Sequence, residues 1–381
     1  MASKIFSTAA EKSRDEAFRQ RAIMRAELYE EKANVEQASI GIRPELIVTA
    51  ETFRLSEKVQ TAIEKGIEWL KQNRKSTGGW GWFPEKIFKG KLYSSKLKDD
   101  LSLTRTWDTA MAIRALLTAE EKPDRQMISE AINWLKQKRN DDGGWGIIPP
   151  AYPDQYPPST YPSQPITKRE TRSNTPDTCC ATIALLDART YLDFNPELIS
   201  KGVNLLMDSR ITGWRRVLSP VWCEYIGEKP PAGKPTLKAT SLALVALLKA
   251  GKKQSFDSLV HIRPWSWNIE ASRNEVEERA YAIIALSEGN EGTSIRQEDI
   301  GWLKLVRNAD SGWGRARADK ESEIESTALA IIALLKAGES SKDVAVRSGV
   351  KWLLSKQRKD NWGPDTPLVI LTLHEFIVRL L

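Results

Sequence analysis

The sequence predicts an all-α fold, an (α/α)6 toroid of six helical hairpins preceded by an N-terminal helical arm. Three observations lead to this fold class. A Gly-Trp phrase recurs along the chain, an amphipathic helix precedes most copies, and a helix that is apolar nearly all round follows them. A helix without a polar face has to be buried on every side. Six such helices alternating with half-exposed ones therefore indicate an inner ring enclosed by an outer ring.

Residues 1–55 predict a charged helical arm, because a thin apolar stripe runs among many Arg and Glu residues. Two interpretations of this arm stay open: a loosely held helix, or a segment that docks on the body or on a partner. Residues 56–381 predict the toroid.

The Gly-Trp phrase marks the turn inside each hairpin. It is complete at 78–81 and 143–146, and weaker copies contain Trp214, Trp265 and Trp267, Trp313, and Trp362. The Gly before the Trp suits the left-handed residue that ends a helix. Each turn Trp is expected to pack between successive hairpins and to bury roughly 150–250 Å². The uneven spacing of the copies fits loops of different lengths within one closed ring.

The inner ring is predicted from six segments that are rich in Ala, Leu and Ile: 108–119, 177–188, 240–250, 278–287, 325–337 and 366–380. The outer helices instead carry an apolar stripe and a charged back, as Ile63, Ile67 and Leu70 show in the first hairpin.

Three long loops, 82–107, 147–176 and 215–238, lead into inner helices and are rich in Lys and Arg or in Pro and Tyr. Helix N-termini carry partial positive charge. We therefore expect an apolar central cavity with an electropositive mouth, suited to a ligand with an apolar tail and an anionic head. Loop 147–176 would serve either as a rigid lid or as a docking surface for a protein partner.

The composition is that of a globular protein, with 28% charged and 41% apolar residues. The net charge of +7 has two interpretations, an anionic partner or ordinary solvated Lys and Arg. No apolar run reaches the roughly 20 residues of a membrane span, and no secretory signal is evident. Three cysteines are too few for a disulfide framework. We expect a cytoplasmic protein without a transmembrane segment, and no DNA-binding module stands out.

Segment 65–81, with Trp69, Gln72 and Gly79-Trp80-Gly81, is similar to the QW repeat of squalene–hopene cyclases. The order of helix, Gly-x-Trp turn, Asp-Thr-Ala and apolar helix resembles the terpene cyclase and protein prenyltransferase superfamily. The resemblance covers about residues 56–381. It implies an α/α toroid and isoprenoid chemistry.

The chain departs from that superfamily at the acid motif. Protonation-initiated cyclases carry Asp-x-Asp-Asp-Thr-Ala, whereas residues 105–110 are Arg-Thr-Trp-Asp-Thr-Ala. Arg105 replaces the first Asp, and Trp107 stands where the proton-donating Asp would be. A strong acid needs a neighbour that keeps it protonated, so Asp108 is poorly supported as an acid, and it is also interpreted as a helix N-cap. Asp177 occupies the same place in the second hairpin. The resemblance thus makes Asp108 and Asp177 the candidate catalytic acids.

Five further residues are candidate substrate contacts. Trp107 and Tyr281 would stabilise a carbocation through their π faces. Glu278 and Glu325 begin inner helices, and Arg105 lies in loop 82–107; all three would shape the mouth. Acidic residues at helix N-termini are also expected from the helix dipole alone.

No cofactor is expected. Asp177 and Cys179 have the local spacing of the zinc ligands of prenyltransferase β subunits, but neither His261 nor His374 is placed to complete the set. No Asp-Asp-x-x-Asp motif occurs, so Mg²⁺ would enter only with a bound diphosphate.

Two classes of function follow. The first is an isoprenoid-handling protein, either a divergent terpene cyclase or a polyprenyl binder, and the residues leave open whether it is an enzyme. The second is a non-catalytic scaffold that binds a protein or an anionic partner through the arm or the three basic, Pro-rich loops.

Overall fold

The computed structural model describes residues 44–81, 104–120, 122–146, 172–213, 219–229, 233, 235–259, 274–289, 295 and 297–380. The N-terminal arm up to residue 43, nearly all of loops 82–107 and 147–176, and part of loop 215–238 lie outside these ranges. No helix within them is long and apolar enough to cross a membrane.

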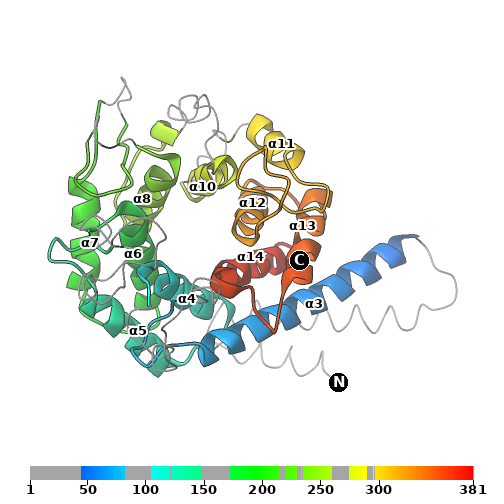
Figure 1. Cartoon of the computed structure of the whole chain (residues 1–381), viewed down its shortest axis with the longest axis horizontal. Helices are drawn as coiled ribbons and strands as arrows, with labels where there is room; N and C mark the ends of the chain where they lie inside the picture. Colours follow the sequence, from blue (N-terminus) through cyan, green and yellow to red (C-terminus); the bar gives the residue numbers. More distant parts are fainter. Residues whose placement is uncertain are drawn as a thin grey trace, which may run out of the picture.

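Six inner helices form a closed ring, which confirms the predicted toroid (Figure 1). They are α4 (Thr106–Ala119), α6 (Thr175–Arg189), α8 (Leu237–Lys249), α10 (Glu275–Glu288), α12 (Ile324–Lys336) and α14 (Thr366–Val378). Each contacts the next, and α14 contacts α4. These helices occupy the centre because they offer almost no polar face to water.

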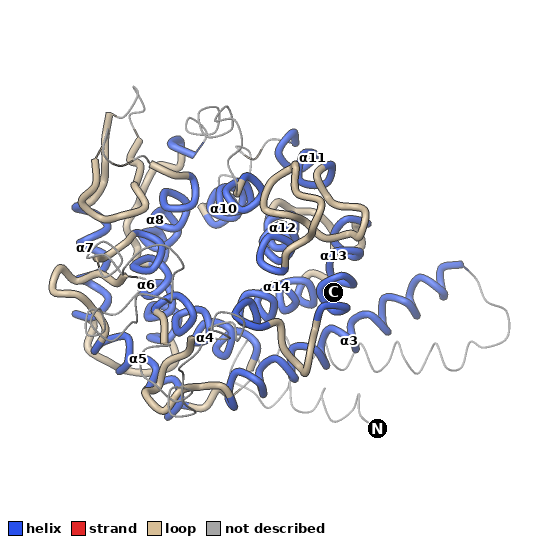
Figure 2. The backbone as a smooth tube through the Cα atoms, viewed as in Figure 1, coloured by secondary structure: helices blue, strands red, loops and turns tan. Residues whose placement is uncertain are grey.

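The outer helices pack around the outside of the inner ring (Figure 2). They are α3 (Pro44–Gln72), α5 (Arg125–Gln137), α7 (Glu197–Asp208), α11 (Gln297–Leu305) and α13 (Val344–Lys356). In α5, Ile128, Ile132 and Leu135 are buried while Lys136 is exposed, as the amphipathic pattern predicts. The outer helix of the fourth hairpin is described only at 257–259.

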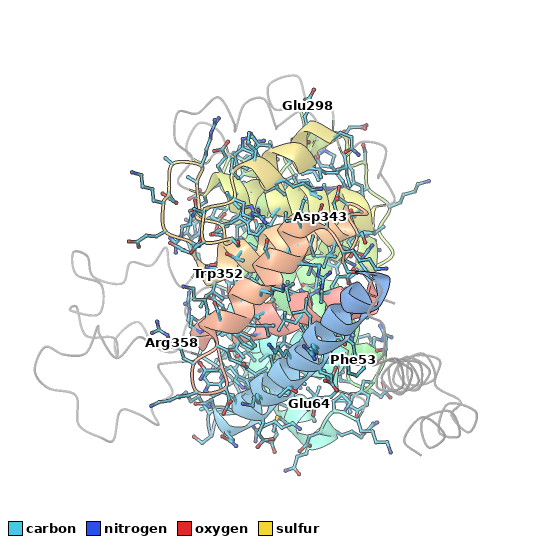
Figure 3. All side chains as sticks on the ribbon, turned by 90° about the vertical axis from the view of Figure 1, so that its right-hand side faces the viewer. Phe53, Glu64, Glu298, Asp343, Trp352 and Arg358 are labelled. Atoms are coloured by element: carbon cyan, nitrogen blue, oxygen red, sulfur yellow. The ribbon has the colours of Figure 1, made fainter. Side chains whose placement is uncertain are left out.

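Helix α3 is continuous from Pro44 to Gln72, so the boundary expected after residue 55 falls inside a helix. It crosses the outside of the ring obliquely, with Phe53 and Glu64 along its length (Figure 3). Its contacts with both α14 and α4 place the first and last parts of the described chain side by side.

Five Trp residues join the two rings by the same pair of hydrogen bonds. Each indole N–H donates to a leucine carbonyl near the end of the preceding outer helix, at 2.6–2.8 Å. Each Trp backbone N–H donates to a threonine hydroxyl in the first turn of the next inner helix, at 2.9–3.1 Å. All five rings are buried: Trp80, Trp145, Trp222, Trp313 and Trp362. The predicted packing role of the turn Trp is confirmed for four of them.

The third hairpin differs from the prediction, because Trp222 rather than Trp214 makes these bonds. Ile211 and Val221 exchange two backbone hydrogen bonds of 3.0 Å. This bridge brings Trp222 to the end of α7, where its indole N–H donates to the Leu206 carbonyl. Trp214, Trp265 and Trp267 lie outside the described residues.

Ion pairs join neighbouring inner helices at the end of the ring where these helices end. Asp187 of α6 accepts from Arg114 of α4 at 3.2 Å and from Lys249 of α8 at 2.8 Å. Lys336 of α12 pairs with Glu288 of α10 at 2.9 Å and more distantly with Glu375 of α14. Charged side chains therefore gather where the inner helices end.

Candidate functional site

The candidate site is the end of the ring where the inner helices begin. The Trp–Thr hydrogen bonds set the register of these helices, and an Asp immediately precedes the threonine three times: Asp108-Thr109, Asp177-Thr178 and Asp365-Thr366. The carboxyl groups of Asp108 and Asp177 are the two acids predicted from the sequence. Asp365 belongs to the same Asp-Thr dipeptide, but it lies between Pro364 and Pro367 and was not predicted.

Asp108 lies in the first turn of α4, where Arg105 is the N-cap residue. The interpretation of Asp108 as the N-cap is therefore wrong. The first turn of this helix starts earlier than the Asp, because Thr106 and Trp107 are already helical. The Asp108 side chain is 9% exposed and belongs to the buried set at this end of the ring.

Asp177 is buried and held by Asn174, the N-cap of α6. Its carboxylate accepts from the Asn174 amide at 2.8 Å, and its backbone N–H donates back to Asn174 at 2.8 Å. Burial raises the pKa of Asp177, while the Asn174 hydrogen bond and the positive charges of Arg105 and Lys238 oppose the rise. Asp177 thus has nearby partners that stabilise its ionised form.

Four carboxyl groups at this end interact electrostatically: Asp108, Glu277, Glu325 and Asp365. Burial, Glu325 and Asp108 raise the pKa of Asp365 to about 7. Burial and Glu325 also raise the pKa of Glu277, whose carboxylate accepts from Ser326 at 3.2 Å. These four side chains come from four different places around the ring.

Glu277, which was not among the predicted site residues, interacts electrostatically with Glu325. The signal was present in the sequence, because Glu277 and Glu325 each lie three positions before the same Ala-x-Ala-Ile-Ile-Ala-Leu pattern. Glu278 is half-buried one position further along α10, where α12 has Ser326.

Lys238 lies close to both Trp107 and Tyr281. It was not predicted as a site residue, because a lone Lys at a helix start usually indicates a solvated charge. The Lys238 ammonium lies 5.2 Å from the Trp107 ring centroid and 5.5 Å from that of Tyr281. The two aromatic residues belong to α4 and α10, which are opposite members of the ring. Their rings and the ammonium group therefore meet across the ring.

Five inner helices each have a half-buried residue five positions after the first-turn residue that corresponds to Thr109. Together these residues form a stripe: Arg114, Val245, Ile284, Ile332 and Leu371. The residues directly before and after most of them are buried. Outer helices cover the outside of the ring and neighbouring helices cover its sides, so we infer that this stripe faces the axis. We call it the axial face. The expected central cavity stays a prediction.

The expected electropositive mouth also stays a prediction. The basic residues of loops 82–107 and 147–176 lie almost wholly outside the described ranges. Within those ranges, carboxylates dominate this end, with Lys238 and Arg105 near Asp177 and with Arg315 within 4.0 Å of Glu277.

The described part of the chain holds no group of three or more His, Cys, Asp or Glu arranged to bind a metal ion. Cys179, Cys180 and Cys223 are free and buried, and burial raises the pKa of the Cys180 thiol to about 12. These thiols therefore pack as small apolar groups. His261 lies outside the described residues, so the expectation of no cofactor stays a prediction.

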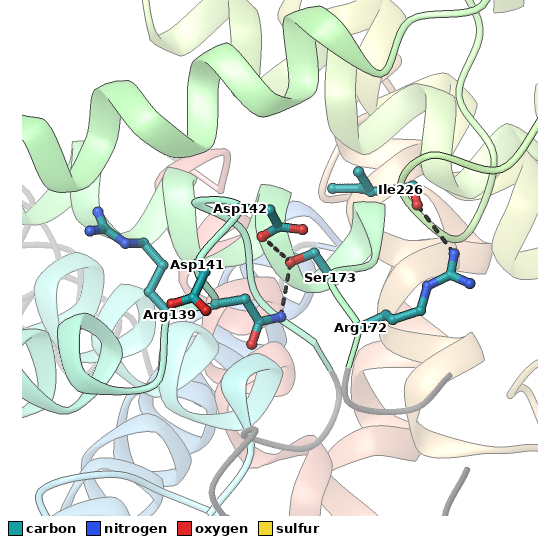
Figure 4. Close-up of a pocket in the computed structure, with 7 residues that line it drawn as sticks. Arg139, Asp141, Asp142, Arg172, Ser173 and Ile226 are labelled. Atoms are coloured by element: carbon teal, nitrogen blue, oxygen red, sulfur yellow. Dashed lines mark hydrogen bonds between the residues drawn. The ribbon is translucent and has the colours of Figure 1, made fainter. Parts of the chain in front are cut away.

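A separate recess of about 480 Å³ lies at the turn after α5 (Figure 4). The Ser173 hydroxyl donates to Asp142 at 2.7 Å and accepts from Asn140 at 2.9 Å. The fifth hairpin repeats this arrangement with Ser322, Asp310 and Asn308. A network that recurs in two turns supports the turn itself, so we assign this recess no chemistry.

The family model for the squalene–hopene cyclase C-terminal domain matches residues 102–216 and 278–367, more than half of the chain. A squalene–hopene cyclase of Zymomonas mobilis is 23% identical over 304 residues, which are 69% of this chain and 44% of that protein. The chain thus spans less than half the length of that relative.

Two solved structures share the fold. One is a variant of the type II terpene cyclase MstE from Scytonema in complex with its substrate, geranylgeranyl dihydroxybenzoate. It aligns with a TM-score of 0.56 at 12% identity, over 86% of this chain and 100% of that one. A protein from Actinoplanes aligns with a TM-score of 0.52 at 13% identity, over 84% of this chain and 99% of that one.

Proposed function

Because this chain belongs to the squalene–hopene cyclase C-terminal domain family, we propose that it binds an isoprenoid chain along its axial face and starts its cyclisation with a carboxylic acid. The observation that carries the proposal is the grouping of carboxyl groups with raised pKa values beside Trp107 and Tyr281 at one end of the ring.

Each part of this arrangement has a role in such a reaction. A carboxyl group that is still protonated near neutral pH can donate its proton to an alkene. The faces of Trp107 and Tyr281 stabilise the positive charge that then develops on carbon. The apolar residues of the axial face, such as Val245 and Ile332, provide a surface for the hydrocarbon.

The size of the chain is compatible with this role. The alignment covers the whole MstE chain, and the substrate of that protein carries a geranylgeranyl group. Proton-initiated cyclisation needs no cofactor, and Mg²⁺ would be needed only if the substrate carries a diphosphate.

The test is to incubate the purified chain with squalene and with a panel of polyprenyl diphosphates, then to extract it with solvent and analyse the extract by mass spectrometry. A new hydrocarbon or terpenol is expected. It should disappear when Asp108, Asp177 and Asp365 are all replaced by Asn.

The other outcomes are also informative. A bound isoprenoid recovered unchanged would assign the chain as a polyprenyl binder. If neither ligand nor product is found, the isoprenoid proposal fails, and the scaffold alternative predicts a protein partner on the loop-bearing end of the ring.

A further inference from the structure

The Lys238 side chain reaches across the ring at the end where the inner helices begin. It belongs to α8, yet its ammonium group lies 5.2 Å from the centroid of the Trp107 ring on α4 and 5.5 Å from that of Tyr281 on α10. Helices α4 and α10 are opposite members of the ring. The ammonium group therefore lies between the two sides of the ring and not on its outer surface.

The sequence positions of Lys238 and Trp107 also place them on the axial face. Lys238 lies seven residues before Val245, and Trp107 lies seven residues before Arg114. Seven residues make about two helical turns, so the members of each pair share one face of their helix. Apart from Arg114, the residues of the axial face are apolar. Lys238 thus places a positive charge at one end of an apolar stripe.

The Lys238 ammonium group has no ion-pair partner in the described part of the chain, where no carboxylate oxygen lies within 4.0 Å of it. Burial raises the pKa values of three nearby carboxyl groups, and the charge of Lys238 opposes that rise: Asp177, Glu224 and Glu277. Two of these groups are held by other partners. Asp177 accepts from Asn174 at 2.8 Å, and Glu277 accepts from Ser326 at 3.2 Å. The ammonium group is therefore available to a further anion.

Neither a helix-end charge nor a solvated charge explains Lys238. The helix dipole favours acidic residues in the first turn, and α4, α6, α10 and α12 each carry at least one there. The Lys238 side chain is also half-buried, and the two aromatic faces attract its charge without neutralising it. A half-buried ammonium group without an ion pair is stabilised when an anion reaches it.

We propose that Lys238 binds the anionic head of the isoprenoid, so that the ligand of this ring is a polyprenyl carboxylate or phosphate rather than a neutral hydrocarbon. This assignment rests on the isoprenoid binding along the axial face that is proposed above. The anion draws the ammonium group away from Trp107 and Tyr281. The faces of both rings are then open to the hydrocarbon that follows the head.

The test measures the affinity of the full chain for three probes of equal tail length by equilibrium dialysis, in a buffer without divalent metal ions. Geranylgeranoic acid and geranylgeranyl diphosphate are the anionic probes, and geranylgeraniol is the neutral one. At least one anionic probe should bind roughly 10–100-fold more tightly than the alcohol, as expected for a charge-assisted hydrogen bond. The probe that shows the larger preference identifies the head as a carboxylate or a phosphate.

Three variants assign this preference to Lys238. Lys238→Met removes the charge, so it should lower the affinity for the anionic probe to that for the alcohol and leave the alcohol affinity unchanged. Lys238→Arg keeps the charge and should keep the preference. Lys252→Met is the matched control, because this exposed lysine lies just beyond the other end of α8. It should leave all three affinities unchanged.

Two results would overturn the assignment: a wild type that binds the alcohol as tightly as both anionic probes, or a Lys238→Met that is folded by circular dichroism and keeps the preference for an anion. The first comparison needs no variant, so it decides the question even if Lys238→Met does not fold. The two proposals can fail separately. Binding of all three probes without preference refutes only this assignment, whereas a wild type that binds none of them and forms no product from any substrate refutes both.

Discussion

Single hydroxyl groups couple the two rings, as Thr178 illustrates. Its Oγ1 accepts from the Trp145 backbone N–H at 3.0 Å, and the same hydroxyl donates to the Trp145 carbonyl at 3.2 Å. Thr178→Val leaves a buried N–H without a partner and should lower the free energy of unfolding by about 1–3 kcal/mol in urea titrations. Thr182→Val, which removes only a bond to the Thr178 carbonyl within α6, should cost less. Equal losses would contradict the coupling role.

Asp365 makes stability depend on pH. Its pKa rises to about 7 in the fold, against an ordinary value near 4, so the folded chain binds a proton more tightly than the unfolded chain. This stabilisation is complete below about pH 4 and is lost as the pH rises through about 7. Urea titrations from pH 5 to pH 8 should therefore show wild-type stability falling, by on the order of 2 kcal/mol, relative to Asp365→Asn. A pH-independent difference between the two proteins would refute the assignment of this pKa.

The candidate residues that sequence reasoning found were those with a local signal. Asp108 precedes a Thr-Ala dipeptide, and Trp107 and Tyr281 are aromatic residues on predicted inner helices. Lys238 has no such signal, and Asp365 has only an Asp-Thr dipeptide that lies between two prolines, because the importance of both residues depends on neighbours across the ring. Lys238 meets Trp107 from another helix, and Asp365 meets carboxylates that lie more than 35 residues away in sequence.

At the scale of elements, the turn glycines test how tightly the hairpins pack. Gly78 has φ +94°, and a Cβ there would lie 2.9 Å from the Glu130 backbone oxygen. Gly338 has φ +95° with open space around it. Gly338→Ala should cost only the left-handed backbone strain, about 1–2 kcal/mol, and Gly78→Ala should cost clearly more. Thermal melting of both variants checks this order, and a reversed order would mean that the turn after α3 is loosely packed.

Inner helices were predictable as elements because their apolar surface leaves no other place for them than the interior. The joints between elements were less predictable. The third joint uses Trp222, which the backbone bridge between Ile211 and Val221 brings to the end of α7. The fourth replaces the usual threonine with Arg279, whose guanidinium lies 3.7 Å from the centroid of the Trp302 ring on α11. Neither change is visible in the periodicity of the flanking helices.

For the molecule as a whole, ring closure predicts cooperative unfolding. Every inner helix has two inner neighbours, and the contact of α14 with α4 removes the free ends that an open array would have. We expect far-ultraviolet circular dichroism and Trp fluorescence to report one coincident thermal transition. Thr109→Val in the first hairpin should shift both signals equally. Two separated transitions would indicate that the ring opens before the hairpins melt.

The closed ring also limits how this chain can change in evolution. In an open array of repeats, the gain or loss of one unit alters a single interface and leaves the others untouched. Here, an added or deleted hairpin would change the angle between every pair of inner helices and would break the contact between α14 and α4. The number of hairpins is therefore a property of the whole ring, and we expect insertions in homologous chains to accumulate in the loops between helices.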